Sequence, residues 1–558
     1  MRIFVAKERY NMHNTGFSMD YIQKTRSMMR VLEASIKSHW ESPALSDYGT
    51  DVSFTFHELA LQIQKMHQFF ENQGIEKGDK IAICDKNSSY WGATFLSVMT
   101  YGAVAVPILA DFNGEQIVNV THHSDAKMLF SSPLMQRKVK AALNGEDDPR
   151  MKGCQFVDIS MVGEKVTDHD ITPDEVHYFD DQPDELAIIN YTSGSTGNSK
   201  GVMLPYRTIW SNIAFADEKL GLKEYCNVLS LLPMAHMYGF SFEFIYELCM
   251  GGHIHFLTKA PSPSVLAKAL ADVQPDILIC VPLIVEKIIQ SRVFPKLKSL
   301  RTQSLLAIPF MKRVIYKKIR QRIIDFFGGK FYELIIGGAA FNQEVESFLH
   351  DCKFPYTVGY GMTECGPIIC YRDYHKFAQG SCGQIVPRME LKIQSKDPTS
   401  VEGEILVRGD NVMLGYYKNE EATREAIDED GWLHTGDLAT IDGEGNVFIR
   451  GRQKNMLLGA NGQNIYPEEI EEKFTSHVLI DECVVIQRDQ KLIGLVYTSD
   501  DTLATHGMTR DDFNSQLDRY LKHINTMLPS FYKVSKLEAR DVEFEKTPKR
   551  NIKRYLYT

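Results

Sequence analysis

Short apolar segments alternate with amphipathic helical segments along most of this 558-residue chain, and this alternation limits the fold more than any other feature. Strand-like and helix-like patterns follow one another at residues 54–85, 277–290 and 331–351. Strands that are joined through helices pair in parallel. The sequence therefore predicts an α/β fold in which helices flank parallel sheets.

The pattern changes near residue 384, where the strand-like segments MELKIQ, GEILVRG and NVFIRG are separated by Gly-, Asp- and Asn-rich turns. This texture predicts a small β-rich subdomain over about 384–450. The strands VVIQRD and KLIGLVYT and a helical segment near 513–527 follow it. Because the chain is longer than one ordinary domain, we predict a large N-terminal domain over 1–451 and a small α+β domain over 452–558.

Composition excludes several classes of protein. Lys and Arg number 62 against 72 Asp and Glu, so a formal charge of −10 argues against a nucleic-acid-binding coat and predicts no nucleic-acid partner. Apolar residues make up 44% of the chain, which excludes wholesale disorder. The ten cysteines include no CxxC pair, which disfavours a structural zinc site. The N-terminus lacks the apolar stretch of a signal peptide, so we expect free thiols and a cytoplasmic location.

One uncharged stretch, residues 91–110, has the length of a bilayer span. Gly102 and Pro107 interrupt it, and AVAVPIL is typical of a strand. We therefore predict a buried helix followed by a buried strand.

The segment YTSGSTGNSKG at 191–201 follows the apolar strand-like ELAIIN. Glycines allow a sharp turn, and successive N–H groups in such a loop form a concave anion site. Composition alone would favour a flexible Gly/Ser loop, but its position after a buried strand and the lysine at its end favour phosphate binding. A Walker A loop has Gly before its Lys and Ser or Thr after it. Here Ser199 precedes Lys200 and Gly201 follows it, which indicates a phosphate loop of another kind.

Five further motifs occur in order: LPMAHMYG at 232–239, GGAA at 337–340, YGMTE at 360–364, WLHTGDL at 432–438 and GRQK at 451–454. Taken singly, the first three have ordinary structural explanations: a core histidine, a tight strand–helix turn and the first turn of a helix. The carboxylates of these motifs could also bind a metal ion or a ribose. Mg²⁺ prefers carboxylate and phosphate oxygens, and one carboxylate can accept hydrogen bonds from both ribose hydroxyls.

Together with the loop at 191–201, these motifs resemble the signatures of the adenylate-forming superfamily, which comprises acyl-CoA synthetases, adenylation domains of peptide synthetases and firefly-type luciferases. The resemblance extends from about Trp40 to Tyr555. It implies a large AMP-binding domain and a small C-terminal domain that rotates about a hinge at Lys454. It also implies a thiol tunnel beside Gly462.

The resemblance further implies residue roles. The catalytic set would be Thr192, Lys200, His236, Thr363 and Glu364, with Thr196 and Glu364 at the metal. The nucleotide would contact Thr192, Ser193, Gly194, Ser195, Thr196, Gly197, Lys200, Gly338, Ala339, Ala340, Tyr360, Gly361, Met362, Thr363, Asp437 and Arg452.

One position departs from the family pattern. The family usually has a Gly-Lys-Ile-x-Arg element near its C-terminus, and its lysine reaches the α-phosphate and the attacking carboxylate. Aligned on Ile552 and Arg554, the lysine position is Asn551 and the glycine position is Arg550. Loss of one such cation typically lowers a rate by about 10²–10³. We therefore expect weakened adenylation, or a neighbouring cation in its place.

The resemblance implies an AMP-forming acid–thiol ligase that uses ATP, Mg²⁺ and coenzyme A. Its substrate would be a small-molecule carboxylic acid, expected to be a long-chain fatty acid because the 40–56 region and the His236 segment resemble that subfamily. A fatty substrate is compatible with peripheral contact at a membrane. Two alternatives stay open: a ligase that loads a carrier protein, and a nucleotide-binding homologue with weak adenylation.

Overall fold

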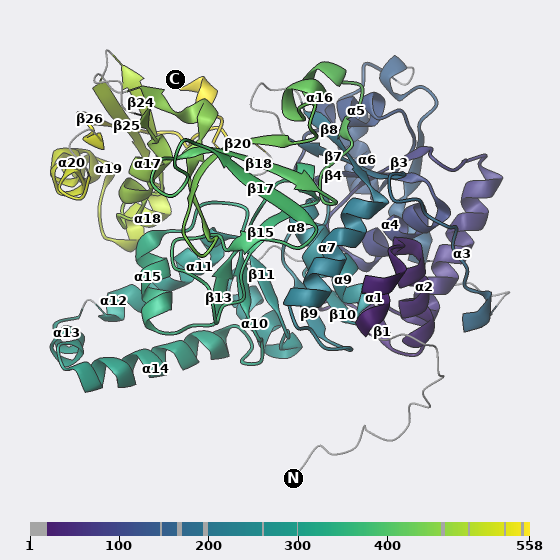
Figure 1. The fold of residues 1–558 in the computed structure, drawn as a ribbon, viewed down its shortest axis with the longest axis horizontal. Coiled ribbons are helices and arrows are strands. Elements are labelled where there is room, and N and C mark those ends of the chain that lie inside the picture. The colour runs from purple at the N-terminus through teal and green to yellow at the C-terminus, as the bar shows by residue number, and fades with distance from the viewer. Residues whose placement is uncertain are drawn as a thin grey trace, which may run out of the picture.

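The computed structural model describes residues 19–145, 148–163, 170–192, 199–258, 262–297, 299–458, 464–488, 491–528, 532–547 and 552–557. The N-terminal part is built on one large sheet and two smaller ones. The large sheet is seven-stranded, with a parallel centre and two antiparallel strands at one edge. Its spatial order is β19 (Gly415–Tyr416), β8 (Lys200–Pro205), β7 (Leu186–Thr192), β4 (Val104–Ile108), β3 (Lys80–Cys84), β5 (Ala126–Ser131) and β6 (Gln155–Asp158). The strands β3, β4, β7 and β8 of the large sheet lie on the right of Figure 1.

Two smaller sheets complete this part. The first has the order β2 (Ser53–Thr55), β1 (Pro43–Asp47), β10 (His253–Phe256) and β9 (Asn227–Ser230). The second is a parallel sheet of β11 (Leu278–Cys280), β12 (Leu334–Ile336) and β13 (Tyr356–Val358). The predicted α/β class with parallel sheets is confirmed.

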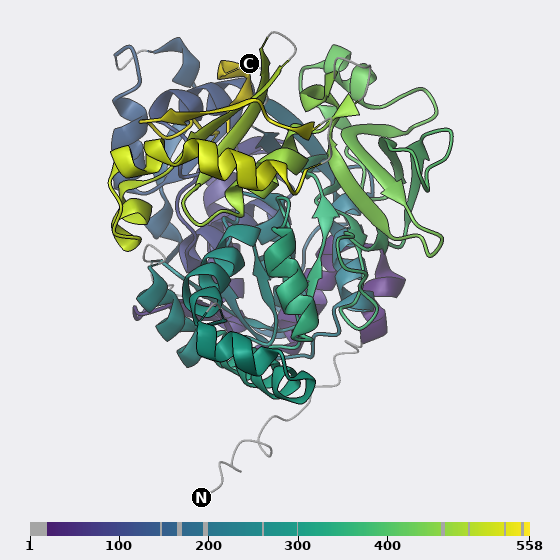
Figure 2. The same ribbon diagram turned by 90° about the vertical axis from the view of Figure 1, so that its left-hand side faces the viewer.

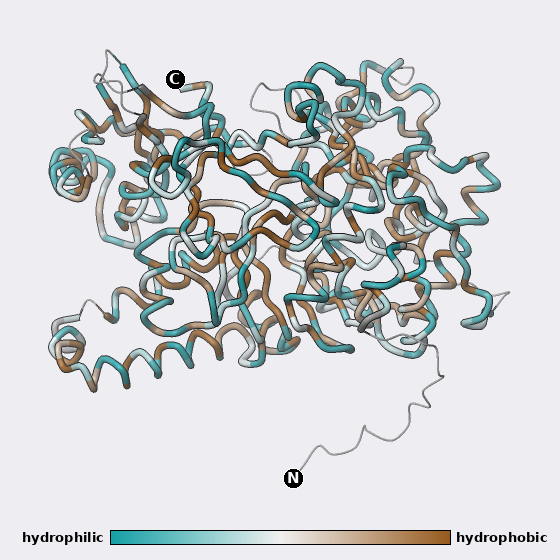
Figure 3. Tube along the Cα trace, viewed as in Figure 1, coloured by the Kyte–Doolittle hydropathy of each residue, from teal (hydrophilic) through white to brown (hydrophobic). Residues whose placement is uncertain are grey.

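Helices cover the faces of these sheets, and Figure 3 shows the brown, hydrophobic segments concentrated in the strands between them. They are α1 (Met19–Thr25), α2 (Met28–Ser38), α3 (Phe56–Asn72), α4 (Ser89–Tyr101), α5 (Gly114–His123), α6 (Pro133–Lys140), α7 (Tyr206–Lys219), α8 (Met237–Phe240), α9 (Tyr246–Cys249), α10 (Pro263–Val273), α11 (Pro282–Ile288), α12 (Phe294–Leu297), α13 (Leu300–Leu306), α14 (Pro309–Phe326) and α15 (Gln343–Asp351). A π-type turn at Ser241–Ile245 joins α8 to α9.

The uncharged stretch at 91–110 forms a buried helix and strand, as predicted. Helix α4 is buried over eleven of its thirteen residues, which explains why its sequence is apolar all round. Gly102 ends it in a left-handed conformation (φ +86°), and every residue of β4 is buried. Among the residues that the structure describes, no helix is both long and apolar enough to cross a bilayer.

Small antiparallel sheets follow β13. They are β14 (Tyr360–Gly361), β15 (Ile368–Tyr371) and β16 (Gln384–Ile385), then β17 (Met389–Gln394), β18 (Gly403–Gly409), β20 (Leu433–Ile441) and β21 (Val447–Arg452), with α16 (Glu420–Ala426) between β19 and β20. The strands expected at MELKIQ, GEILVRG and NVFIRG are β17, β18 and β21. The β17–β21 sheet lies on the right of Figure 2.

The C-terminal part contains a second core. It has β22 (Leu457–Leu458), β23 (Asn464–Ile465), α17 (Pro467–Thr475), β24 (Glu482–Arg488), β25 (Lys491–Tyr497), α18 (Asp500–Thr505), α19 (Arg510–Ser515), α20 (Leu517–Asn525) and β26 (Lys536–Arg540). Its own apolar cluster includes Ile470, Phe474 and Val496. Figure 2 shows its yellow helices in front of the N-terminal part.

Candidate functional site

Two of the predicted motifs leave the carboxyl ends of neighbouring parallel strands. Residues 337–340 follow β12, and Tyr360 follows β13 after Gly359. The N–H of Gly359 donates to the carbonyl of Ile336 over 2.8 Å, which holds the two exits together. Gly338 has a φ of +87°, a conformation that favours glycine, and Ala339 and Ala340 are exposed. Ligands of open α/β sheets bind at this kind of edge.

A buried carboxylate links the third motif to the fourth. The hydroxyl of Tyr360 donates to Asp437 Oδ2 over 2.6 Å, and Arg452 Nε lies 3.0 Å from Asp437 Oδ1. Burial raises the pKa of Asp437, whereas the charge of Arg452 and the Tyr360 bond oppose the rise. The nearby charge of Glu364 adds to the rise. The structure therefore brings Tyr360 and Glu364 close to Asp437 and Arg452, which lie more than 70 positions later in the sequence.

The residues on either side of the phosphate-loop candidate pair with each other in the antiparallel strands β7 and β8. Thr192 faces Lys200 in the antiparallel register, and its hydroxyl donates to the carbonyl of Lys200 over 3.5 Å. The ammonium of Lys200 lies 4.6 Å from the ring centre of Tyr416. The predicted loop residues Ser193, Gly194, Ser195, Thr196 and Gly197 lie outside the described residues.

Tyr416 is a site residue that the sequence reasoning missed. It lies on β19, beside β8, and its hydroxyl donates to Glu364 Oε1 over 2.9 Å. Its ring therefore contacts Lys200 on one side while its hydroxyl holds Glu364. The only local signal was the GYY run after residue 414, which carries no charge.

Glu364 is a fitting ligand for Mg²⁺. Its carboxylate is half-buried and has no ion pair within the part of the chain that the structure describes. Thr363 beside it is buried, with 5% of its surface exposed. A hard divalent cation is held by one or two carboxylates and by phosphate oxygens, so the donor set fits a magnesium–nucleotide complex.

His236 caps the short helix α8. Its Nδ1 accepts from the backbone N–H of Tyr238 over 3.3 Å, so the tautomer assigned by this bond has its proton on Nε2. Asn190 on β7 donates to the carbonyl of Ala235 over 2.9 Å. The strand that leads into the phosphate-loop candidate therefore also positions the His236 segment.

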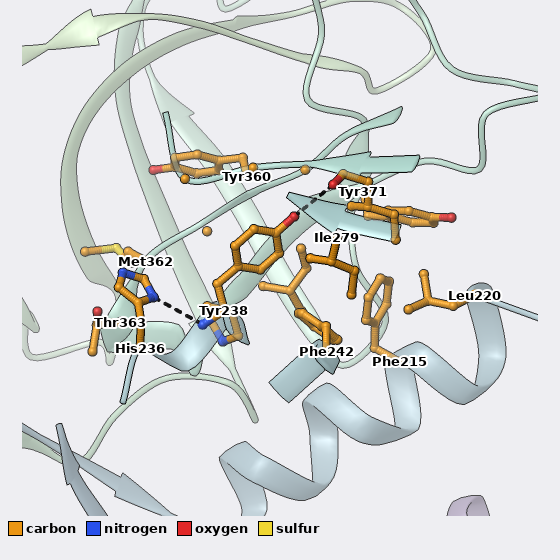
Figure 4. Close-up of a pocket in the computed structure, with 17 residues that line it drawn as sticks. Phe215, Leu220, His236, Tyr238, Phe242, Ile279, Tyr360, Met362, Thr363 and Tyr371 are labelled. Carbon is orange, nitrogen blue, oxygen red and sulfur yellow. Dashed lines mark hydrogen bonds between the residues drawn. The ribbon is translucent and has the colours of Figure 1, made fainter. Parts of the chain in front are cut away.

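Three of the predicted motifs, at 232–239, 337–340 and 360–364, contribute residues to one pocket, which Figure 4 shows. His236, Met362 and Thr363 lie at one end, and Tyr238 stands in the middle. Phe215, Leu220, Phe242, Ile279 and Tyr371 lie toward the other end, with Tyr360 along another side. The remaining lining residues are Ile335, Gly337, Gly338, Gly359, Gly361, Pro367 and Ile368.

The far end of this pocket, which we call the apolar wall (Phe215, Leu220, Phe242 and Tyr371), was not predicted. No Lys, Arg, Asp or Glu lines the pocket among the described residues. Behind the wall, Tyr371 donates to Glu333 Oε2 over 2.7 Å, and burial raises the pKa of Glu333 to about 8. The wall therefore presents apolar side chains to the pocket, and the hydrogen bond to Glu333 holds Tyr371 in place. It suits an uncharged, apolar group.

The C-terminal part meets the rest through hydrogen bonds. Gln343 N–H donates to Glu472 Oε1 over 2.8 Å, Asn342 Nδ2 donates to Ser476 over 2.9 Å, and Tyr466 donates to Glu402 over 2.7 Å. Lys454 is exposed in a 3₁₀ turn (Gln453–Asn455) directly after β21. Polar contacts of this kind are typical of domains that move relative to each other.

The C-terminal tail is anchored by a two-pronged ion pair. Arg554 Nη1 and Nη2 lie 2.6 and 2.5 Å from the two oxygens of Glu471 on α17. Lys553 pairs with Glu545 over 3.2 Å, so its charge is directed to that carboxylate. Asn551 and Gly462 lie outside the described residues.

Two family models and many curated proteins match this chain. The family model described as "AMP-binding enzyme" matches residues 32–417, and the model described as "AMP-binding enzyme C-terminal domain" matches 454–557. The 4-coumarate–CoA ligase of Vanilla planifolia is 25% identical over 90% of each chain. The peroxisomal long chain acyl-CoA synthetase 6 of Arabidopsis thaliana is 27% identical over 77% of this chain and 66% of its own.

Solved structures share the fold. ATP-bound MatB from Rhodopseudomonas palustris superposes with a TM-score of 0.75 at 21% identity, covering 95% of this chain and 98% of its own. The o-succinylbenzoate coenzyme A synthetase MenE of Bacillus subtilis, in complex with ATP and a magnesium ion, gives 0.74 at 20% identity, covering 94% and 98%.

Proposed function

Since this chain belongs to the AMP-binding enzymes, whose family model covers residues 32–417, we propose that it is an AMP-forming acid–thiol ligase. In this proposal a carboxylate attacks the α-phosphate of ATP to give an acyl-adenylate and pyrophosphate, and the thiol of coenzyme A then displaces AMP. Relatives named as CoA ligases and as a long-chain acyl-CoA synthetase support both the reaction and the acceptor.

One observation carries the proposal: a single pocket joins the predicted nucleotide residues to an apolar wall. His236, Met362 and Thr363 occupy one end, and Phe215 and Leu220 occupy the other. A carboxylate at the first end would therefore have an apolar tail at the second.

The apolar wall supports a monocarboxylic acid with an uncharged tail. A second carboxylate placed there would lose its hydration without gaining a cation, which is costly. We propose a long-chain fatty acid as the first candidate. An aromatic acid is the second, because 4-coumarate–CoA ligases are also among the relatives.

Each site residue has a task in this reaction. Asp437, held by Tyr360 and Arg452, has lone pairs left to accept the ribose hydroxyls. Lys200 supplies positive charge at the base of the phosphate loop. Glu364 would hold Mg²⁺, and the ion would neutralise phosphate charge when bound.

The second half-reaction needs a different arrangement of the C-terminal part. We propose rotation about Lys454, which lies in the 3₁₀ turn that follows β21. The few hydrogen bonds at the interface, such as Gln343 to Glu472, would exchange for others. Such motions shield reactive intermediates from water and often limit turnover.

The test is a panel of acids with the purified full chain, ATP and Mg²⁺. Palmitate, octanoate, 4-coumarate and malonate are scored for acid-dependent AMP and pyrophosphate, with and without coenzyme A. We expect release of both products with apolar acids, an acyl-CoA product only when the thiol is present, and no reaction with malonate. ATP hydrolysis at full rate without any acid would refute the proposal.

The acceptor is tested in the same assay. A holo carrier protein replaces coenzyme A in a parallel set of reactions. Acylation of the carrier protein without formation of acyl-CoA would show that the chain is the carrier-loading type of ligase instead.

A further inference from the structure

A strongly basic segment stands out in this acidic chain. Residues 282–327 contain eleven Lys and Arg but only two acidic residues, Glu286 and Asp325, whereas the whole chain has a formal charge of −10. The segment comprises helices α11 to α14. It is therefore a local concentration of positive charge that neither the nucleotide site nor the pocket uses.

Helix α14 projects from the body of the protein. In Figure 1 it runs along the lower left edge, with α13 at its outer end, and Figure 2 shows both at the bottom of the molecule. Of its eighteen residues, only Ile323 is buried. Figure 3 shows hydrophilic and hydrophobic residues alternating along its length.

The cations on α14 are largely unpaired. Lys312 pairs with Asp351 over 3.2 Å, and Arg320 donates to the carbonyl of Lys353. The other four are exposed and form no ion pair with any described residue: Arg313, Lys317, Lys318 and Arg322. Four uncompensated charges on one helix attract a polyanionic surface.

Apolar residues are exposed next to these charges. Leu305, Ile308 and Phe310 lie where α13 passes into α14, and 36%, 50% and 72% of their surfaces are exposed. We call these three residues the α13–α14 tip. Exposed bulky apolar side chains beside cations are typical of surfaces that enter the headgroup region of a membrane.

We propose that the α13–α14 tip and the four unpaired cations of α14 form a docking surface for an anionic phospholipid bilayer. The cations would lie at the headgroup phosphates, and the tip would enter the boundary between headgroups and acyl chains. The charge fits any polyanion. The tip favours lipid over nucleic acid, because phosphate contacts alone make no use of an exposed Phe, Ile and Leu.

The experiment measures co-sedimentation of the full chain with phosphatidylcholine vesicles, with and without phosphatidylserine. We expect binding that requires phosphatidylserine and weakens as salt screens the charges. The double variant Lys317→Glu and Lys318→Glu should bind at least about tenfold more weakly. The matched control is Lys152→Glu with Lys396→Glu, which makes the same change in net charge at exposed lysines elsewhere and should bind like the unchanged protein.

A second pair of variants separates lipid from nucleic acid. Ile308→Ser and Phe310→Ser keep every charge but remove apolar surface, so vesicle binding should fall about tenfold while retention on duplex DNA stays the same. Both residues are exposed, and thermal melting checks that the variants fold.

The proposal is overturned if the protein binds neither kind of vesicle, or binds both equally. It is also overturned if charge reversal on α14 acts no more strongly than the control. Full vesicle binding by the serine variants, with tight retention on DNA, would make the surface a nucleic-acid site instead. None of these readouts depends on ligase activity.

Discussion

Asp437 and Arg452 face each other on the neighbouring strands β20 and β21, and the guanidinium Nε lies 3.0 Å from the carboxylate. Tyr360, from the other side of the site, donates to the second oxygen of the same carboxylate. A carboxylate fixed at both oxygens is held in one orientation before any ligand arrives, so binding needs little further ordering of that side chain.

Asp437→Asn should weaken AMP binding by about 10- to 100-fold, because hydrogen bonds to a charged group contribute about 1.5–3 kcal/mol. Tyr360→Phe keeps the ring but removes the hydrogen bond to Asp437 Oδ2, so the loss of AMP affinity should be smaller than in Asp437→Asn. Isothermal titration with AMP measures both. Asp430→Asn, at an exposed turn, is the control. Equal AMP affinity in Asp437→Asn and the unchanged protein would exclude Asp437 from the nucleotide site.

Tyr416→Phe removes the hydroxyl that holds Glu364 while leaving the ring over Lys200. We expect the Mg²⁺ concentration for half-maximal AMP formation to rise about three- to tenfold. Tyr417→Phe is a matched control, because the neighbouring hydroxyl donates to Asp125 instead. If both variants require the same Mg²⁺ as the unchanged protein, Tyr416 does not position a metal ligand.

Leu220→Ala removes side-chain atoms from the apolar wall and so enlarges that end of the pocket. The variant should favour longer acids. The ratio of kcat/KM for palmitate over octanoate should rise about tenfold, since each buried methylene is worth about 0.8 kcal/mol. The control Leu266→Ala deletes the same atoms from a buried leucine that does not line the pocket. If the two variants change the ratio equally, the wall does not contact the acid.

Asn551→Lys places a cation where the adenylate-forming enzymes usually have one. Acid-dependent pyrophosphate release should increase by about 10²–10³. Lys553 does not substitute in this structure, because it pairs with Glu545. A pyrophosphate-exchange assay measures the step apart from thiol transfer, and Asn551→Gln serves as the uncharged control. An unchanged rate in Asn551→Lys would mean that another group already supplies the charge.

Glu247 on α9 should make the protein less stable as pH rises. It is fully buried, its two oxygens have no hydrogen-bond partner among the described residues, and burial raises its pKa to about 8. The folded state therefore holds a proton that the unfolded chain releases near its ordinary value of 4.5. The contribution of protonated Glu247 to the free energy of unfolding is complete below about pH 4.5 and is lost as pH rises toward 8.

Glu247→Gln mimics the protonated acid at every pH. Above pH 8 we expect the variant to be more stable than the unchanged protein, on the order of 3 kcal/mol, with little difference near pH 5. Urea unfolding across this pH range measures it. The exposed Glu421→Gln should leave the curve unchanged. Parallel pH curves for Glu247→Gln and the unchanged protein would contradict the raised pKa.

Local pattern predicted the fold well. The helix and strand at 91–110 and the strands at MELKIQ, GEILVRG and NVFIRG are confirmed, because apolar periodicity and turn residues act over a few positions. The apolar wall could not be predicted in this way. Phe215 lies on α7, Leu220 caps the C-terminal end of that helix, and Tyr371 lies on β15; nothing local to either segment indicates that the fold places them around one pocket.

Tyr416 escaped prediction for a related reason. Its partners Lys200 and Glu364 lie 216 and 52 positions away in the sequence, and only strand pairing between β19 and β8 brings it to them. The roles assigned to the motif residues stay predictions, and the variants above test them.

The two ends of the pocket share the segment after β9, which supplies His236 to one end and Phe242 to the other. The apolar wall also takes Phe215 from α7 and Tyr371 from β15, and neither element contributes to the end with His236 and Thr363. In the proposed reaction, we therefore expect substitution of Phe215 on α7 to change which acids react while the residues at the nucleotide end stay in place. On this proposal, the acid preference of related enzymes would evolve through single substitutions in the apolar wall.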